Sequence, residues 1–180
     1  MGPVIALVAA VVLGQVSVGV EAGGAYGVSL RPAYGALAGV TVSPSEVAWL
    51  EGGLLLGYQA EPYAIYDAYL GGAHVRGATH RLQVLGTGGV RFRVWRVALA
   101  PHVVVGWSKV WLSGSFDNEL QNVHGRLEET VGAFTLGLGA AVSFQVVERV
   151  QVRARVVGPL PFSSGVTGYM TVSLGVVVEF

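Results

Sequence analysis

The stretch that decides the fold is 169-YMTVSLGVVVEF-180, in which two kinds of side chain alternate along the sequence. One set is mostly small or polar, from Tyr169 and Thr171 to Glu179. The other set is apolar throughout and consists of Met170, Val172, Leu174, Val176, Val178 and Phe180. Because successive side chains of a β-strand point to opposite faces, this period of two predicts a strand with one apolar face.

The same period of two recurs in seven further segments of the chain. In each segment the larger apolar residues fall on one face, and Gly, Ser, Thr, Arg or Glu fall on the other. The segments are 16–22, 34–42, 49–58, 81–93, 97–108, 134–145 and 149–156. Their lengths are close to the roughly 9–11 residues that a tilted strand needs to cross a bilayer. Eight such segments predict an all-β, antiparallel, up-and-down fold.

The composition favours exposure of these strands to lipid. The chain is 52% hydrophobic and 12% charged, whereas a typical soluble domain is about 25% charged. Its mean hydropathy is +0.58, yet after the N-terminus no run of apolar residues is long enough for a spanning helix. The apolar residues are therefore distributed over strands, in agreement with the 27 glycines and the frequent valines.

Two arrangements of the alternating faces are open: a soluble barrel or sandwich with apolar residues inside, and a membrane barrel with apolar residues outside. An eight-stranded barrel has an interior that side chains just fill. The Phe, Leu and Trp residues of the apolar faces would overfill it, whereas the small, polar set fits. The sequence therefore predicts an eight-stranded transmembrane β-barrel.

The inward faces of this predicted barrel contain charged residues of both signs. Because an unpaired charge in a closed interior costs several kcal/mol, we expect acids and arginines to pair there and to plug the lumen. An interior lined by arginines on one side would instead favour a narrow anion pathway. The predicted interior network consists of Glu21, Glu51, Arg91, His102, Arg153, Arg155 and Glu179.

The apolar run 3–14 has the length of a signal-peptide core and is too short to span a bilayer. We expect cleavage after Gly14, so that 1–14 is the signal peptide and 15–180 the barrel. A second candidate site follows Ala22. A first β-strand or a buried core segment is the alternative interpretation of this run, and no Lys or Arg precedes it.

The connections between the predicted strands alternate between short and long, as is typical of outer-membrane barrels. Short turns are expected at 43–46, 94–96 and 147–148, and longer loops at 59–78, 113–126 and 158–168. Aromatic residues lie near the predicted strand ends, where amphipathic rings favour the headgroup region of a bilayer. The residues expected in this girdle are Tyr34, Trp49, Tyr58, Trp95, Trp107, Trp111 and Tyr169.

Three places give the chain a resemblance to a known group. They are the start, Gln15-Val-Ser-Val-Gly-Val-Glu-Ala-Gly, the middle segment 80–107 with Arg91-Phe-Arg and Ala100-Pro-His, and the end, 172–180. The chain resembles the small eight-stranded outer-membrane β-barrels of the OmpA type, often called porin-family proteins. The resemblance implies export through the periplasm to the outer membrane of a Gram-negative-type cell, and contact with outer-membrane lipid. It also implies that the barrel assembly machinery reads a terminal β-signal made of Val172, Leu174, Val176, Val178 and Phe180.

The sequence gives little indication of a nucleic-acid, metal, cofactor or catalytic site. The chain has no cysteine, and its formal net charge of zero gives no reason to expect a nucleic-acid partner. Its histidines, at 74, 80, 102 and 124, lie too far apart in sequence for a metal site, and we expect no cofactor and no catalytic residues. We expect His74, His80 and His124 in or beside loops.

Three functions then remain. The first is a structural or interaction role in the cell envelope, with a loop partner that the sequence does not identify. The second is a narrow pore or transporter for small solutes or apolar molecules. The third is a lipid-modifying enzyme, for which the sequence offers no defensible Ser-His-acid spacing.

Overall fold

The computed structural model describes residues 16–28, 33–44, 47–67, 73–118, 123–161 and 170–180. These ranges contain nine strands, and no helix within them is long and apolar enough to cross a membrane. The strands are β1 (Val16–Val28), β2 (Ala33–Pro44), β3 (Leu50–Asp67), β4 (Ala73–Val90), β5 (Phe92–Val94), β6 (Val97–Asn118), β7 (Val123–Val147), β8 (Val150–Pro161) and β9 (Met170–Glu179).

The strands form one closed antiparallel sheet. Its order is β4-β3-β2-β1-β9-β8-β7-β6-β5, and a further pairing of β4 with β6 closes the ring. Only Arg91 separates β4 from β5, and both pair with β6, so the two act as one strand of an eight-stranded barrel. The predicted fold class is therefore confirmed. Where all eight strands pair, closure leaves the described part of the ring without an open sheet edge, as a membrane barrel requires.

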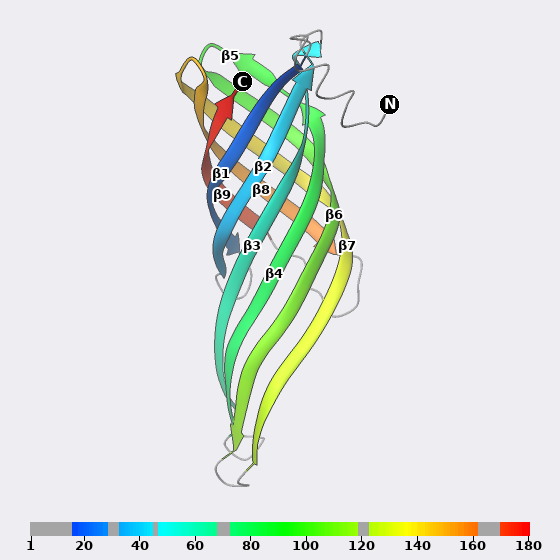
Figure 1. The fold of residues 1–180 in the computed structure, drawn as a ribbon, viewed down its shortest axis with the longest axis vertical. Coiled ribbons are helices and arrows are strands. Elements are labelled where there is room, and N and C mark those ends of the chain that lie inside the picture. Colours follow the sequence, from blue (N-terminus) through cyan, green and yellow to red (C-terminus); the bar gives the residue numbers. More distant parts are fainter. Residues whose placement is uncertain (1–15, 29–32, 45–46, 68–72, 119–122, 162–169) are drawn as a thin grey trace.

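The two ends of the barrel differ. At one end, the turn end, two-residue turns at Trp95–Arg96 and Glu148–Arg149 connect the strands, and the last residue, Phe180, lies there (Figure 1). These turns fall where short turns were predicted. Trp95 has a φ of 54°, in the left-handed region that tight hairpin turns require. The opposite end is called the loop end below.

Four neighbouring strands are much longer than the others at the loop end (Figure 1). Strands β6 and β7 have 22 and 25 residues, whereas β9 has 10. The pairing of β3 with β2 ends at Ala60, and that of β7 with β8 ends at Thr135. Beyond these residues, the ends of β3, β4, β6 and β7 form a four-stranded extension, which we call the projecting sheet.

The projecting sheet corrects the prediction of long loops at 59–78 and 113–126. Strand β3 continues to Asp67 and β4 begins at Ala73, while β6 continues to Asn118 and β7 begins at Val123. Both segments are thus mainly paired strand. The third predicted loop, 158–168, begins within β8, and its remainder lies outside the described residues.

The faces of the strands have the arrangement predicted for a membrane barrel. Most inward side chains are small or polar, apart from one group of aliphatic residues described below, and large apolar side chains cover the outer surface. Leu138 and Leu174, for example, are 72% and 62% exposed. Glycine permits the strands to pack closely at some inward positions: a Cβ at Gly23 would meet the backbone of Leu174 and Gly175 on the neighbouring β9.

Candidate functional site

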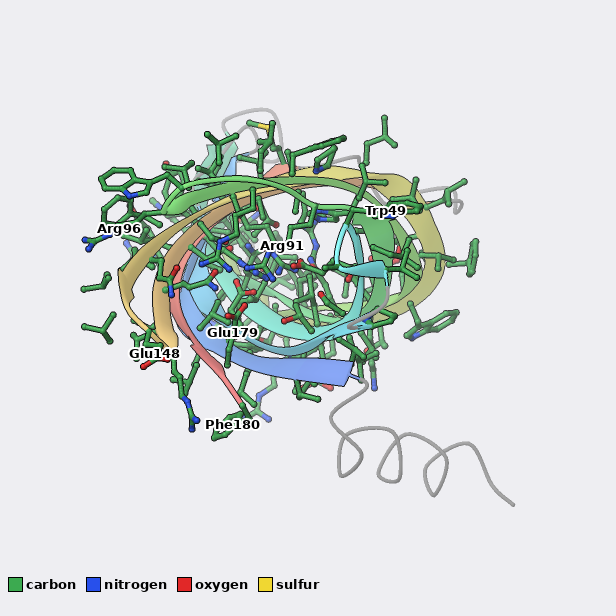
Figure 2. All side chains as sticks on the ribbon, turned by 90° about the horizontal axis from the view of Figure 1, so that it is seen from above. Trp49, Arg91, Arg96, Glu148, Glu179 and Phe180 are labelled. Carbon is green, nitrogen blue, oxygen red and sulfur yellow. The ribbon has the colours of Figure 1, made fainter. Side chains whose placement is uncertain are left out.

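The charged side chains of the barrel interior form the clearest candidate site. They lie near the turn end on β1, β3, β8 and β9 and in the junction between β4 and β5, and they form what we call the charge layer. Figure 2, viewed from the turn end, shows Arg91 and Glu179 within the ring of strands. The layer consists of Glu21, Glu51, Arg91, Arg153, Arg155 and Glu179.

Arg153 and Arg155 share the carboxylate of Glu21. The distance from Arg155 Nη2 to Glu21 Oε2 is 2.6 Å, and that from Arg153 Nη1 to the same oxygen is 3.5 Å. Arg153 also directs both terminal nitrogens to Glu51, each at 3.3 Å, and donates from Nε to Ser143 Oγ at 2.8 Å. The residues Glu21, Arg153 and Arg155 are only 1–2% exposed. Such fully buried charges require this pairing.

Arg91 extends the layer toward the turn end. Its Nη2 donates to Glu179 Oε1 at 3.0 Å and to Gln151 Oε1 at 3.3 Å. Its Nη1 lies 3.7 Å from Glu51 Oε2. Acids and arginines therefore alternate through the whole layer, and its three positive charges balance its three negative charges.

His102 shares the interior but belongs to no ion pair that the structure shows with the charge layer. Its Nδ1 contacts the carbonyl oxygen of Ala100 at 2.9 Å, and its buried Nε2 has no hydrogen-bond partner. A Cβ on Gly139 would collide with the His102 ring. The absence of a side chain at Gly139 therefore makes room for this imidazole.

Above the charge layer, toward the loop end, aliphatic side chains fill the barrel. They contact one another and are at most 8% exposed. We call this group the apolar layer, and it consists of Ala25, Leu37, Leu55, Leu85, Val104 and Val157. The sequence analysis missed it as a unit, because each of its six residues comes from a different strand, whose inward face is otherwise mostly small and polar. Their common depth follows from the register between strands.

A second polar layer follows beyond the apolar layer. It contains the buried side chains of Gln59, Gln83, Ser108, Thr135 and Thr171. Gln59 Nε2 donates to Thr171 Oγ1 at 3.1 Å across the interior. The interior thus changes from charged to apolar to polar along the barrel axis.

Aromatic side chains surround the outside of the barrel at two levels. Near the turn end they are Trp49, Phe92, Trp95, Phe144 and Phe180, which are 45–78% exposed. Nearer the loop end they are Tyr26, Tyr34, Tyr58, Trp107 and Phe134, which are 41–62% exposed and form what we call the upper aromatic ring. Of the predicted girdle, Tyr169 lies outside the described residues, and Trp111 lies on β6 beyond Trp107.

The residues of the predicted β-signal lie on the outward face of the last strand and at its end. Val172, Leu174 and Val176 are 37%, 62% and 47% exposed, and Phe180 is 71% exposed. The intervening Ser173 and Val177 are buried in the barrel. Figure 2 shows Phe180 at the outside of the ring. The outward row is therefore accessible to lipid or to another protein.

The prediction that His74, His80 and His124 lie in or beside loops needs correction for His80, which lies well within β4. His74 and His124 are the second residues of β4 and β7, beside the connections that precede these strands. His124 Nδ1 lies 2.7 Å from Asp117 Oδ1. Within the described ranges, no group of three or more His, Asp or Glu side chains could hold a metal ion.

Comparison with known proteins supports the architecture. The structure is similar to that of a major outer membrane protein from Thermus thermophilus, with a TM-score of 0.65 and 15% identity over 92% of this chain and 99% of that one. Ail, the attachment invasion locus protein of Yersinia pestis, is similar with a TM-score of 0.56 and 15% identity, again over 92% and 99% of the two chains. A second structure of Ail, in complex with the heparin analogue sucrose octasulfate, gives the same TM-score.

No protein-family model matches the sequence, and no curated protein matches it either. At 15% identity the structural likeness concerns the fold. The chain has the fold of the small outer-membrane β-barrels, and the predicted resemblance to that group is confirmed at this level.

Proposed function

We propose that this chain, which has the fold of the small outer-membrane β-barrels, is an integral outer-membrane protein with a structural or interaction role and a plugged interior. The outward apolar surface between the two levels of aromatic residues supports the membrane location. In water this surface would be costly, because exposed apolar area is unfavourable. In a bilayer it is solvated by acyl chains.

The orientation follows from the two ends of the barrel. In outer-membrane barrels, short turns face the periplasm and longer connections face outward. We therefore place the turn end, with Phe180, in the periplasm and the projecting sheet outside the cell. Export would use the segment 1–14 as a signal peptide. Of the two cleavage sites, the one after Gly14 leaves β1 intact, whereas Ala22 lies within β1, paired with both β2 and β9.

The apolar layer is the observation that best supports a plugged interior. Leu55 is 1% exposed, Leu85 3% and Val104 0%, so they leave little room for water at this depth. An ion crossing this layer would lose its hydration without gaining polar ligands, which is strongly unfavourable. The charge layer below adds a second obstacle, because its arginines and acids are paired with one another across the lumen.

The projecting sheet supports an interaction role rather than a purely structural one. It extends beyond the part of the barrel that a bilayer would surround, and its outer face contains exposed polar residues such as Arg76, Ser113 and Arg126. A rigid, paired sheet positions such residues more precisely than a loop does. This surface is available to a partner at the cell surface or in the membrane.

Recording currents across planar lipid bilayers that contain the refolded protein tests the plugged interior. We expect no steady conductance above that of the protein-free bilayer. Discrete, steady conductance steps would contradict the plug and would favour the alternative of a narrow pore. A triple variant L55S/L85S/V104S provides the positive control, because replacing the apolar layer by hydroxyl groups should admit water and raise the conductance.

A further inference from the structure

A groove at the turn end lies between two neighbouring hairpins of the barrel, β5–β6 and β7–β8. Its volume is about 230 Å³, and it is lined by Arg96, Gln145, Val146, Val147 and Glu148. We call it the turn groove. Figure 2 shows Arg96 and Glu148 on the same side of the barrel, and both residues are exposed. The groove therefore has a cation on one hairpin and an acid on the other.

Gln145 holds these two hairpins together. Its backbone N–H donates to the carbonyl oxygen of Arg96 at 2.8 Å, and its side-chain Nε2 donates to the carbonyl oxygen of Glu148 at 2.9 Å. Its side-chain Oε1 accepts a hydrogen bond from Arg93. Because Gln145 binds both Arg96 and Glu148 directly, these two residues lie close together in the folded barrel.

A β-bulge gives the turn groove an apolar surface. The register between β7 and β8 shifts by one residue between Gln145 and Val147. Such a bulge leaves one residue unpaired and redirects the neighbouring side chains. As a result, the consecutive residues Val146 and Val147 are both exposed, by 49% and 58%. They place apolar surface beside the two charges.

The charges of the turn groove are not used by the protein itself. Among the residues that the structure describes, no ion pair involves Arg96 or Glu148. The guanidinium of Arg96 lies over the ring of Trp95, with Cζ 5.3 Å from the ring centroid. Both charges are therefore available to a ligand that carries an anion and a cation.

The turn groove lies at the border of the lipid-exposed surface. On β7, Val146 is the next outward position after Phe144, and on β6 the partner of Phe144 is Val97, which directly follows Arg96. One such step along a strand covers about 7 Å. Because exposed aromatic rings mark the border between hydrocarbon and headgroups, the groove beside Phe144 meets lipid headgroups.

We propose that the turn groove binds the headgroup of a phospholipid with a primary amine, of the phosphatidylethanolamine class. The phosphate contacts Arg96, and the ammonium group contacts Glu148. This inference rests on the membrane insertion of the proposed function.

Charge complementarity supports this choice of lipid. The headgroup has one negative and one positive charge joined by two carbons, and the groove has one cation and one acid beside apolar surface. The planar fork of an arginine suits a phosphate. An ammonium group donates charge-assisted hydrogen bonds to a carboxylate, whereas the trimethylated amine of phosphatidylcholine has no N–H to donate. Glu148 should therefore distinguish the two lipids.

Brominated lipids test the proposal, because bromine on an acyl chain quenches the fluorescence of a nearby tryptophan. The variant W49F/W107F/W111F retains Trp95 beside the groove. The variant W95F/W107F/W111F retains Trp49, which lies on the other side of the turn end (Figure 2). Each is refolded into phosphatidylcholine vesicles with the same fraction of brominated phosphatidylethanolamine or brominated phosphatidylcholine. Beside Trp95 we expect phosphatidylethanolamine to be favoured about twofold or more, the effect of one exposed ion pair, and beside Trp49 we expect no preference.

Substitutions in the protein that retains Trp95 identify the groups responsible. E148Q should abolish the preference, because it removes the carboxylate, and R96Q should weaken it, because it removes the contact with phosphate. R149Q is the matched control: it removes an exposed arginine of the same turn that does not line the groove, and the preference should remain. Heat-dependent gel migration verifies that every variant is folded.

Three results would overturn the proposed site: equal quenching of Trp95 by the two lipids, the same preference beside Trp49, or a preference that survives E148Q. Absence of quenching of both tryptophans by either lipid would instead contradict membrane insertion. Failure of the site and failure of the proposed function are therefore distinguishable.

Discussion

Arg155 of β8 donates a hydrogen bond of 2.6 Å to Glu21 of β1, inside the closed barrel. The two residues are 134 positions apart in the sequence, and β9 lies between their strands. Their contact therefore forms only when the ring of strands closes. The ion pairs of the charge layer therefore depend on closure of the barrel and in turn stabilise the closed form.

Replacing Glu21 by Gln should strongly destabilise the barrel. The substitution leaves Arg155 without its ion-pair partner and removes one of the two acids that Arg153 contacts. Removing one partner of a buried pair costs about 3–5 kcal/mol. Unfolding by urea in lipid vesicles gives this free energy. The exposed Glu148 in the β7–β8 turn is the control, and E148Q should change stability by less than about 0.5 kcal/mol. Equal effects of the two substitutions would contradict the pairing.

Leu54 and Leu55 allow the two faces of one strand to be compared. Leu55 is 1% exposed within the apolar layer, and Leu54 is 56% exposed on the outer surface. We expect L55A to cost about 2–5 kcal/mol, because it creates a cavity in the interior. L54A should cost less, because lipid chains can occupy the space that it vacates. The same urea titration compares them, and a greater loss for L54A would show that the faces have been assigned the wrong way round.

Gly23 and Gly24 provide a second pair of adjacent positions. A Cβ at Gly23 would overlap backbone atoms of Leu174 and Gly175, whereas a Cβ at Gly24 would meet nothing within 4 Å. The variant G23V should therefore prevent closure of β1 onto β9, and G24V should fold. Heat-modifiable migration on a gel reports closure. A normal shift for G23V would mean that the two strands are less closely packed than described.

Deletion of Phe180 should impair assembly of the barrel in cells while leaving refolding in detergent nearly unchanged. The reason is that Phe180 and the outward row of β9 are proposed as a recognition signal, and Phe180 makes one backbone hydrogen bond, to Val18, outside the ladder. F92A, which removes another exposed aromatic near the turn end, is the control. If both variants reach the outer membrane in normal amounts, the proposed β-signal role is wrong.

Much of this fold was predictable, because a strand in a membrane barrel alternates between lipid and lumen along its whole spanning length. That alternation also placed Glu21, Arg153 and Arg155 on inward faces. It could not specify which acid meets which arginine, since Glu51 and Arg153 become neighbours only through the register of all intervening strands. The same lack of register information concealed the apolar layer.

The sequence pattern did not predict the projecting sheet, for a different reason. Within the membrane region of β6 the outward residues are apolar, as Val103 and Val105 are. Further along the strand, Ser113 faces outward and is exposed, while Leu112 and Phe116 face inward and are partly buried. The environment of the outer face changes from lipid to water at this border. The apolar residues of β6 therefore change from the outward to the inward face at this border. In the sequence, the pattern of one continuous strand then looks like that of a strand followed by a loop.

The central claim is that the chain is an inside-out barrel with lipid around it and a closed interior. Because the chain has no cysteine, single cysteines can be introduced along β9 at residues 171, 172, 173, 174 and 176 and spin-labelled in lipid vesicles. Accessibility to oxygen, which concentrates in hydrocarbon, should be high at Val172, Leu174 and Val176 and low at Thr171 and Ser173. A uniform accessibility, or high contact of the apolar positions with a water-soluble relaxation agent, would contradict the account.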